Sequence, residues 1–268
     1  MLKYFRKCDI MIKILFGVSV MRGLGTIINV LAIILGSGLG LIFKKGISER
    51  FRQIMTQACG LAVVFIGIGG AIEMMLSFEN GKIVSDGGML IVFSLLLGGL
   101  CGELINIEKR LDSIGEKIKS KVKAKGDGQF VEGFVTASLV VCVGAMAICG
   151  PIDEALTGDS TTLIIKSILD CIIVMVFASV YGVGVIFSAL AVGIYQGFFT
   201  VFGTLISGFM SDALITSLSG IGSILIFAVG VNLIRPKTIR VGNFLPALLV
   251  PVLYEVALYL LRLCGIAC

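Results

Sequence analysis

Long apolar runs, separated by short polar segments, follow one another along the whole chain. A bilayer-spanning helix needs about 20 mostly apolar residues, whereas outer-membrane strands would be about ten residues long with alternating hydrophobicity. The runs are continuous and therefore predict helices. The sequence predicts an all-α polytopic membrane protein with about eight transmembrane helices, near Gly23–Phe43, Met55–Leu76, Gly88–Ile107, Val131–Gly150, Thr161–Tyr181, Gly182–Phe202, Ala213–Ile234 and Phe244–Leu261.

Lys and Arg residues gather in alternate loops between these runs. The first, third and seventh loops hold most of the 22 basic residues, whereas the intervening loops are acidic or neutral. Because basic loops are retained on the cytoplasmic side, we expect these loops inside and both ends of the eight-helix unit outside.

The longest polar segment, residues 108–130, is rich in lysine. Its apolar residues, with one just before it, recur at helical spacing, at Ile107, Leu111, Ile114 and Ile118. This spacing predicts an amphipathic helix that lies on an anionic inner leaflet. A segment that binds a cytoplasmic partner is the alternative.

The apolar runs predict one transmembrane domain over residues 23–262, followed by a short tail at 263–268. Residues 1–22 do not fit this scheme, because they are basic although the topology places them outside. Three interpretations stay open: a start codon assigned too early, with the true initiator at Met21; a short extra helix; or a weak signal-like segment that lacks an A-x-A cleavage site.

Composition agrees with a membrane protein and narrows the function classes. Residues of the AVILMFWYC class make up 57% of the chain and charged residues 15%, with a mean hydropathy of +1.07; soluble domains average about 25% charged residues. The net charge of +5 follows the loop pattern, so we expect no nucleic-acid partner. The chain has no histidine and no P-loop, GxSxG or HExxH motif, and we expect no metal, no cofactor and no conventional enzyme activity.

Two three-helix segments of the sequence resemble each other. An offset of about 157 residues places Gly25 on Gly182 and Gly36 on Gly193, and the next helices align after a short insertion. The match predicts an inverted repeat of helices 1–3 and 6–8, flanking helices 4–5. Such repeats recur in secondary transporters, with the substrate site near the bilayer midplane, and they occur in channels as well.

Three GxxxG pairs occur within the spans, at Gly36 and Gly40, Gly98 and Gly102, and Gly193 and Gly197. A four-residue spacing places both glycines of a pair on one helix face, so that another backbone can approach closely. Each pair predicts either the seam of a homodimer or tight packing within the bundle.

A few ionisable and polar side chains lie within the predicted spans, where they are costly and usually functional. Lys166 and Asp170 have the i, i+4 spacing of an ion pair, which is either structural or contains a carboxylate that binds a cation or carries a proton. Repeat symmetry would place Glu103 opposite Glu255. The side chains predicted to line an ion or solute pathway are Asp170, Glu255, Glu103, Gln196, Asn29, Asn232, Thr136 and Ser138.

An unusual segment follows the fourth span. Gly150–Pro151 is predicted to break the helix, because proline has no amide proton and restricts the residue before it. An acidic cluster follows on the outer side, at Asp153, Glu154 and Asp159. It predicts either a mouth that attracts cations or a solvated turn.

Three blocks, at Gly25–Ile68, Gly133–Asp159 (which contains GPIDEALTGD) and Lys166–Gly197, resemble the YqgA/YdfK-like bacterial inner-membrane family, a domain of unknown function. The resemblance extends over nearly all of residues 21–261. Ala155 and Cys171 stand where glycine is usual. The resemblance implies a bacterial plasma-membrane protein with a transport role, but it supplies neither a substrate nor functional residues.

The sequence thus favours a transporter or channel for an ion or small solute, with a monovalent cation or a proton bound at the buried carboxylates and membrane lipid around the bundle. The alternative is a non-transporting scaffold or sensor that binds a cytoplasmic partner through its lysine-rich loop. A membrane enzyme that acts on lipid is a third hypothesis, for which no nucleophile–base set is recognisable.

Overall fold

The computed structural model describes residues 23–44, 48–79, 82–85, 87–123, 129–206, 210–236 and 238–263. In these ranges seven helices are long and apolar enough to cross a membrane, and a bent helix pair brings the number to eight. The predicted all-α polytopic architecture is therefore confirmed. The prediction for residues 1–22, and nearly all of that for the tail, lie outside the described residues.

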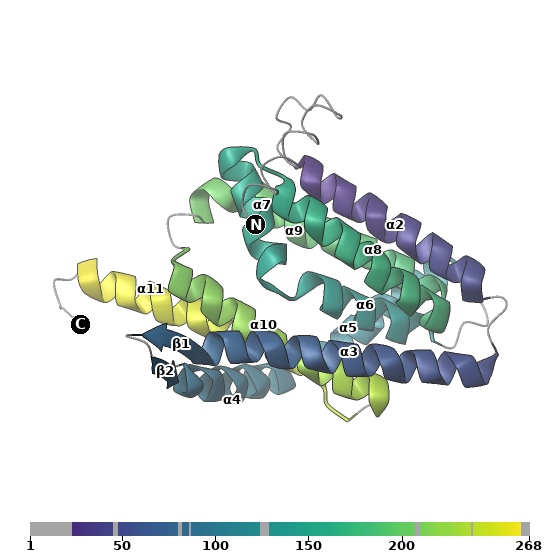
Figure 1. Ribbon diagram of the computed structural model, residues 1–268, viewed down its shortest axis with the longest axis horizontal. Coiled ribbons are helices and arrows are strands. Elements are labelled where there is room, and N and C mark those ends of the chain that lie inside the picture. Colours follow the sequence, from purple (N-terminus) through teal and green to yellow (C-terminus); the bar gives the residue numbers. More distant parts are fainter. Residues whose placement is uncertain are drawn as a thin grey trace.

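The elements follow the apolar runs closely (Figure 1). In chain order they are α2 (Leu24–Lys44), α3 (Glu49–Met75), β1 (Leu76–Glu79), β2 (Lys82–Ser85), α4 (Gly88–Ile105), α5 (Ile107–Lys121), α6 (Phe130–Cys142), α7 (Ala145–Thr157), α8 (Thr161–Tyr181), the 3-10 helix η1 (Val183–Phe187), α9 (Ser188–Ile206), α10 (Asp212–Ile234), the 3-10 helix η3 (Val241–Leu248) and α11 (Leu249–Leu263).

A short antiparallel hairpin joins α3 to α4, where the sequence analysis expected only a polar loop. Leu76 pairs with Ser85, so the extended chain begins at the residue that follows the end of α3. At its other end, α4 is followed by Asn106, which adopts a left-handed conformation and so redirects the chain into α5. Asparagine tolerates this conformation better than most residues.

Helix directions agree with eight spans that alternate across the membrane. α2 runs parallel to α8, since Gly25 faces Leu163 and Gly40 faces Met175. α3 runs antiparallel to α10, and α4 antiparallel to η3. The α2–α8 approach is close: a Cβ atom on Gly36 would lie 2.4 Å from the Cys171 carbonyl oxygen. Glycine therefore sets the distance between these two helices.

The fourth span is broken into two half-helices. α6 ends at Cys142 and α7 begins at Ala145, with a bend of 55° between them. Gly144, at a φ of +135°, makes the break, because this conformation is rare for residues with a side chain. The prediction that Gly150–Pro151 breaks this helix is wrong: Pro151 lies inside α7, where it removes one helical hydrogen bond without ending the helix.

The half-helices lie at opposite ends of α8, so together they cross the bundle once. α6 packs at the junction of α8 and η1, where Gly133 faces Tyr181. α7 packs at the other end, where Gly150 faces Leu163. The 21 residues of α8 extend about 30 Å at 1.5 Å per residue, which is the thickness of the hydrocarbon core.

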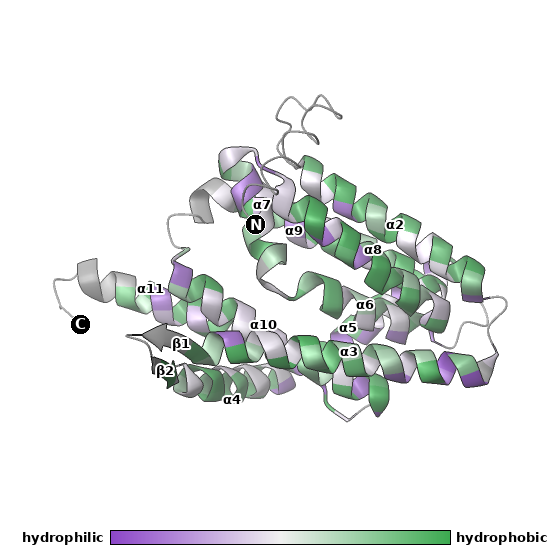
Figure 2. Cartoon of the chain, in the orientation of Figure 1, coloured by the Kyte–Doolittle hydropathy of each residue, from purple (hydrophilic) through white to green (hydrophobic). Residues whose placement is uncertain are grey.

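Hydrophobic residues follow the helices over most of their length (Figure 2), and they are found on the outside of the bundle as well as in its core. Leu35 is 66% exposed and Phe65 is 70% exposed, whereas Phe177 and Ile221 are buried. In water, exposed apolar surface of this extent would be costly. The surface therefore fits a bilayer, and the few polar side chains inside the bundle become the candidates for function.

Candidate functional site

A buried polar site forms where α2, α6, α8 and α9 meet. α8 carries Lys166 and Asp170 one turn apart on the same face. The parallel crossing of α2 brings Asn29 beside Asp170, and α9 contributes Gln196. All four side chains are buried, Asn29 and Gln196 completely. The structure thus brings together four of the residues that the sequence analysis selected.

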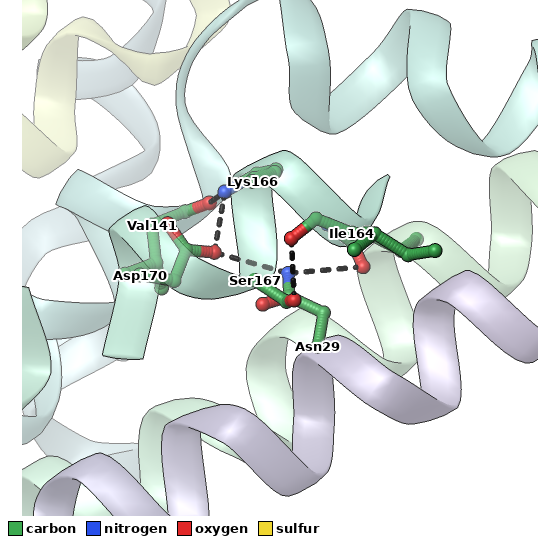
Figure 3. A network of polar contacts seen from close by, with 7 residues as sticks. Asn29, Val141, Ile164, Lys166, Ser167 and Asp170 are labelled. Atoms are coloured by element: carbon green, nitrogen blue, oxygen red, sulfur yellow. Dashed lines mark hydrogen bonds and ion pairs between the residues drawn. The ribbon is translucent and has the colours of Figure 1, made fainter. Parts of the chain in front are cut away.

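The contacts in this site form one connected network (Figure 3). Lys166 Nζ lies 2.5 Å from Asp170 Oδ2 and donates to the Val141 carbonyl oxygen at 2.8 Å. Asn29 Nδ2 donates to Asp170 Oδ2 at 3.0 Å and to Gln196 Oε1 at 3.3 Å. Lys166 thus points into the bundle and forms the ion pair that its spacing from Asp170 predicts.

The break in the fourth span supplies part of this site. The last carbonyl groups of a helix lack partners within the helix and form the negative end of its dipole. Val141 is the last residue but one of α6, and its carbonyl accepts the Lys166 ammonium. Sequence reasoning missed this group, because a main-chain carbonyl leaves no mark in the residue pattern unless the break at Gly144 is recognised.

Two polar atoms in the network have no partner. Asn29 Oδ1 and Gln196 Nε2 are buried and form no hydrogen bond. Because a buried polar atom without a partner costs about 1–3 kcal/mol, such atoms are uncommon in native structures. One is an acceptor and the other a donor, so the pair is suited to a water molecule or a small polar ligand.

Glu255 and Glu103 lie outside this network. Glu255 accepts a hydrogen bond from Ser211, which caps the start of α10. Glu103 forms an ion pair with Arg240 and accepts from Asn243 Nδ2 at 2.6 Å. The repeat-based pairing of Glu103 with Glu255 is therefore absent among these contacts, and Asp170 shares its site with neither.

Thr136 and Asn232 line a cavity of about 800 Å³ beside α5, α6, α10 and η3. Asn232 also fixes the turn after α10, because its amide donates to the Ile239 carbonyl at 2.6 Å and accepts from the Ile239 amide at 2.9 Å. Ser138 lines a separate, apolar cavity of about 390 Å³ next to the break, and its hydroxyl is buried without a partner.

The amphipathic helix predicted in the lysine-rich segment is α5, and its apolar residues line the second cavity. At its start, Glu108 accepts from the Gly242 amide at 2.7 Å, while its own amide donates to Asn243 Oδ1 at 2.8 Å. Burial raises the pKa of the Glu108 carboxyl above its ordinary value, and the hydrogen bond from Gly242 opposes that shift.

The outer acidic cluster divides into two parts. Asp153 and Asp159 are exposed, and Asp159 Oδ1 accepts from the Thr161 amide at 3.0 Å. Glu154 is fully buried instead and accepts from the Gly25 amide at 2.7 Å and from the Ser160 hydroxyl at 2.5 Å. The prediction that Glu154 belongs to an exposed acidic cluster is therefore wrong. Its side chain turns inward and accepts a hydrogen bond from an amide at the start of α2 that has no partner within the helix.

The GxxxG pairs differ in their surroundings. Gly36 and Gly40 meet the main chain of α8, and Gly98 and Gly102 meet that of η3, so both pairs pack within the bundle. Around a Cβ atom placed on Gly193, only Val30 of the described residues lies within 4 Å, and none does at Gly197.

In the described ranges, no group of three His, Cys, Asp or Glu side chains is arranged to hold a metal ion.

Comparison with known proteins gives a family but no activity. The family described as "Protein of unknown function (DUF554)" matches residues 24–256. The chain is 36% identical over 227 residues to the uncharacterized membrane protein YdfK of Bacillus subtilis, covering 85% of this chain and 93% of that protein. It is 30% identical over 230 residues to the uncharacterized protein YqgA of Escherichia coli, covering 84% and 93%. No solved structure matches. The chain therefore belongs to the DUF554 family, as the three sequence blocks indicated. It is a membrane protein of unknown function.

Proposed function

We propose that this protein is a transporter or channel for an ion or small solute in the bacterial cytoplasmic membrane. The observation that carries the proposal is the buried Lys166–Asp170 pair at the break between α6 and α7. Ionisable groups at membrane depth are costly and mark ion or substrate pathways. In the same site, Asn29 Oδ1 and Gln196 Nε2 are buried without a hydrogen-bond partner, which suits a bound water molecule or a polar ligand.

The broken span supports the same function. In secondary transporters, half-helices that meet near the midplane present unpaired carbonyl or amide groups to the ligand. Here α6 presents the Val141 carbonyl at such a point. The α3–α10 crossing adds support for an inverted repeat, because Gly60 and Gly230, on the helices aligned as repeat partners, face each other across it.

Two cavities lie beside α6, and no residue of the buried polar site lines either of them. The larger cavity is lined by the polar side chains Thr136 and Asn232 and by Leu139. Leu139 also lines the apolar cavity that reaches Cys142 and Val143 at the break. With the lysine-rich loops inside, the larger cavity opens toward the cytoplasm, and movement of α6 about the break would connect it with the buried site.

The test is flux through purified protein reconstituted in lipid vesicles, with sodium and potassium gradients and a pH-sensitive dye inside. We expect flux above that of protein-free vesicles and a loss of at least about tenfold in Asp170→Asn. Asp212→Asn, a matched change at the exposed start of α10, should retain wild-type flux. Equal flux in Asp170→Asn and wild type would remove Asp170 from the pathway.

The second candidate is a scaffold or sensor. It is favoured by α5, whose apolar residues line a cavity of the bundle while Lys117 and Lys121 are exposed. This function predicts capture of a cytoplasmic partner that is lost in Lys117→Gln/Lys121→Gln, together with vesicles that show no flux. Flux that depends on Asp170 would argue against it.

A further inference from the structure

The Lys166 ammonium occupies a position built for a cation. The Asp170 carboxylate lies on one side, at 2.5 Å, and the Val141 carbonyl at the end of α6 on the other, at 2.8 Å. Figure 3 shows Lys166 turned toward both groups and Asn29 reaching Asp170 from α2. Helix ends of this kind, together with a carboxylate, bind monovalent cations in broken transporter helices. In this chain the Lys166 ammonium occupies the corresponding position.

A third oxygen lies in the same network without a donor. Asn29 Oδ1 is fully buried and accepts no hydrogen bond, while the nitrogen of the same amide holds Asp170. An amide oxygen is a good ligand for a hard cation, and this one has no donor among the contacts of the network. At the ammonium itself the site offers one carboxylate and one neutral oxygen, which suits a monovalent ion better than a divalent one.

Charge determines how a cation can enter. Lys166 and Asp170 together are neutral, and both are buried. An added cation beside a charged Lys166 would leave a net positive charge in a medium of low dielectric constant, which is unfavourable. If Lys166 releases one proton as the cation binds, the charge of the site does not change.

We propose that Lys166 and Asp170 form an exchange site in which one monovalent cation replaces one proton. When the cation binds between the Asp170 carboxylate and the Val141 carbonyl, the Lys166 ammonium loses one proton and becomes a neutral amine, and the proton leaves to solvent. The reverse step returns a proton to the amine and releases the cation. This inference specifies the kind of ion for the proposed transport function. Only the movement of that ion across the membrane rests on the proposed function; binding at the site does not.

The surrounding titratable groups leave Lys166 as the proton donor. Among the described residues, Cys142 of α6 interacts electrostatically with both members of the pair. Asn29 and Gln196, from α2 and α9, are uncharged. Tyr195 of α9 interacts with Cys142, and Cys171 follows Asp170 on α8. At the ends of α8, Glu154 of α7 binds Ser160, and Glu132 of α6 and Cys59 of α3 interact with Tyr181.

The first experiment measures sodium binding to the purified protein by thermal stabilisation, at several pH values. Because each bound ion displaces one proton, the apparent affinity should rise about tenfold for each pH unit. Potassium serves as the second probe. An affinity for sodium that does not change with pH, or no binding of either ion, would overturn the inference.

Two substitutions of Lys166 separate charge from proton release. Lys166→Arg keeps the positive charge, but arginine does not deprotonate in proteins, so sodium binding should be lost at every pH. Lys166→Met removes the ammonium that competes for the Asp170 carboxylate, so sodium should bind at least about tenfold more tightly than to wild type at neutral pH. Lys117→Met, an exposed control on α5, should behave as wild type. Unchanged sodium binding in Lys166→Arg would contradict the exchange.

Flux in vesicles distinguishes the two proposals. Sodium binding with the expected pH slope, but without any flux, would keep the exchange site and remove the transport function. Cation flux that continues in Lys166→Arg would keep transport and remove the exchange site. If both hold, an outward sodium gradient should acidify the vesicle interior, and Lys166→Arg should abolish that pH change.

Discussion

Two ion pairs among the described residues, Lys166–Asp170 and Arg240–Glu103, lie in opposite environments. The side chains of Lys166 and Asp170 are 9% and 5% exposed, whereas those of Arg240 and Glu103 are 69% and 53% exposed. The second pair joins the last turn of α4 to the start of η3, where water screens it. The first has lost its hydration and depends on its partners. The comparison shows that a carboxylate within an apolar run gains its role from what surrounds it.

The largest effect should come from breaking the buried pair. Asp170→Asn leaves the Lys166 ammonium buried without a counter-charge and should lower the free energy of unfolding by about 3–5 kcal/mol. Unfolding of the purified protein in detergent measures this loss. The double variant Lys166→Met/Asp170→Asn carries no buried charge and should recover most of it; a double variant as unstable as Asp170→Asn would contradict the explanation.

The close approach of α2 and α8, which encloses the buried pair, should be the next most sensitive feature. Gly36→Ala places a Cβ atom 2.4 Å from the Cys171 carbonyl oxygen, and the forced separation should cost about 1–3 kcal/mol. Gly38→Ala is the matched control on the same helix, since nothing lies within 4 Å of its Cβ position. Equal unfolding temperatures for the two variants would show that contact at Gly36 does not limit the approach.

Breaking the exposed pair should have a much smaller effect. Glu103→Gln removes the charge opposite Arg240 and keeps an acceptor for Asn243, so a loss of only about 0–1 kcal/mol is expected. The difference from wild type should shrink further at high salt, because the pair is screened. A loss as large as that of Asp170→Asn would erase the contrast between the two environments.

The smallest expected effect is a pH dependence at the same end of α4. The raised pKa of Glu108 means that the folded protein holds its proton more tightly than the unfolded chain. The contribution to stability is therefore present at low pH and is lost as pH rises from the ordinary carboxyl range through the raised value. Glu108→Gln, which keeps the acceptor for Gly242, should flatten that decline in unfolding temperature; an unchanged decline would assign it to another group.

The spans were predictable because hydrogen bonding within a membrane helix is local. Thr161–Tyr181 was predicted to the residue, and the other continuous spans lie within about four residues of their helices or 3-10 segments, except that α3 begins six residues before the predicted Met55. The fourth span differed, because Gly144 and Pro151 are both helix breakers in sequence and only the packing of α7 shows that the helix continues through Pro151. The inward turn of Glu154 was likewise hidden, since its partner Gly25 is 129 positions away.

The sequence by itself determined that the chain is a membrane protein, where its spans lie and which few charges enter them. Those properties follow from residue-by-residue hydrophobicity and from the i, i+4 geometry of a helix. Only the tertiary structure decided that Asn29, Gln196 and the Val141 carbonyl meet Asp170 and Lys166, and that Glu255 meets Ser211 instead. The reason is physical: contacts between helices depend on which faces pack and where the chain bends, and these contacts join residues far apart in the sequence.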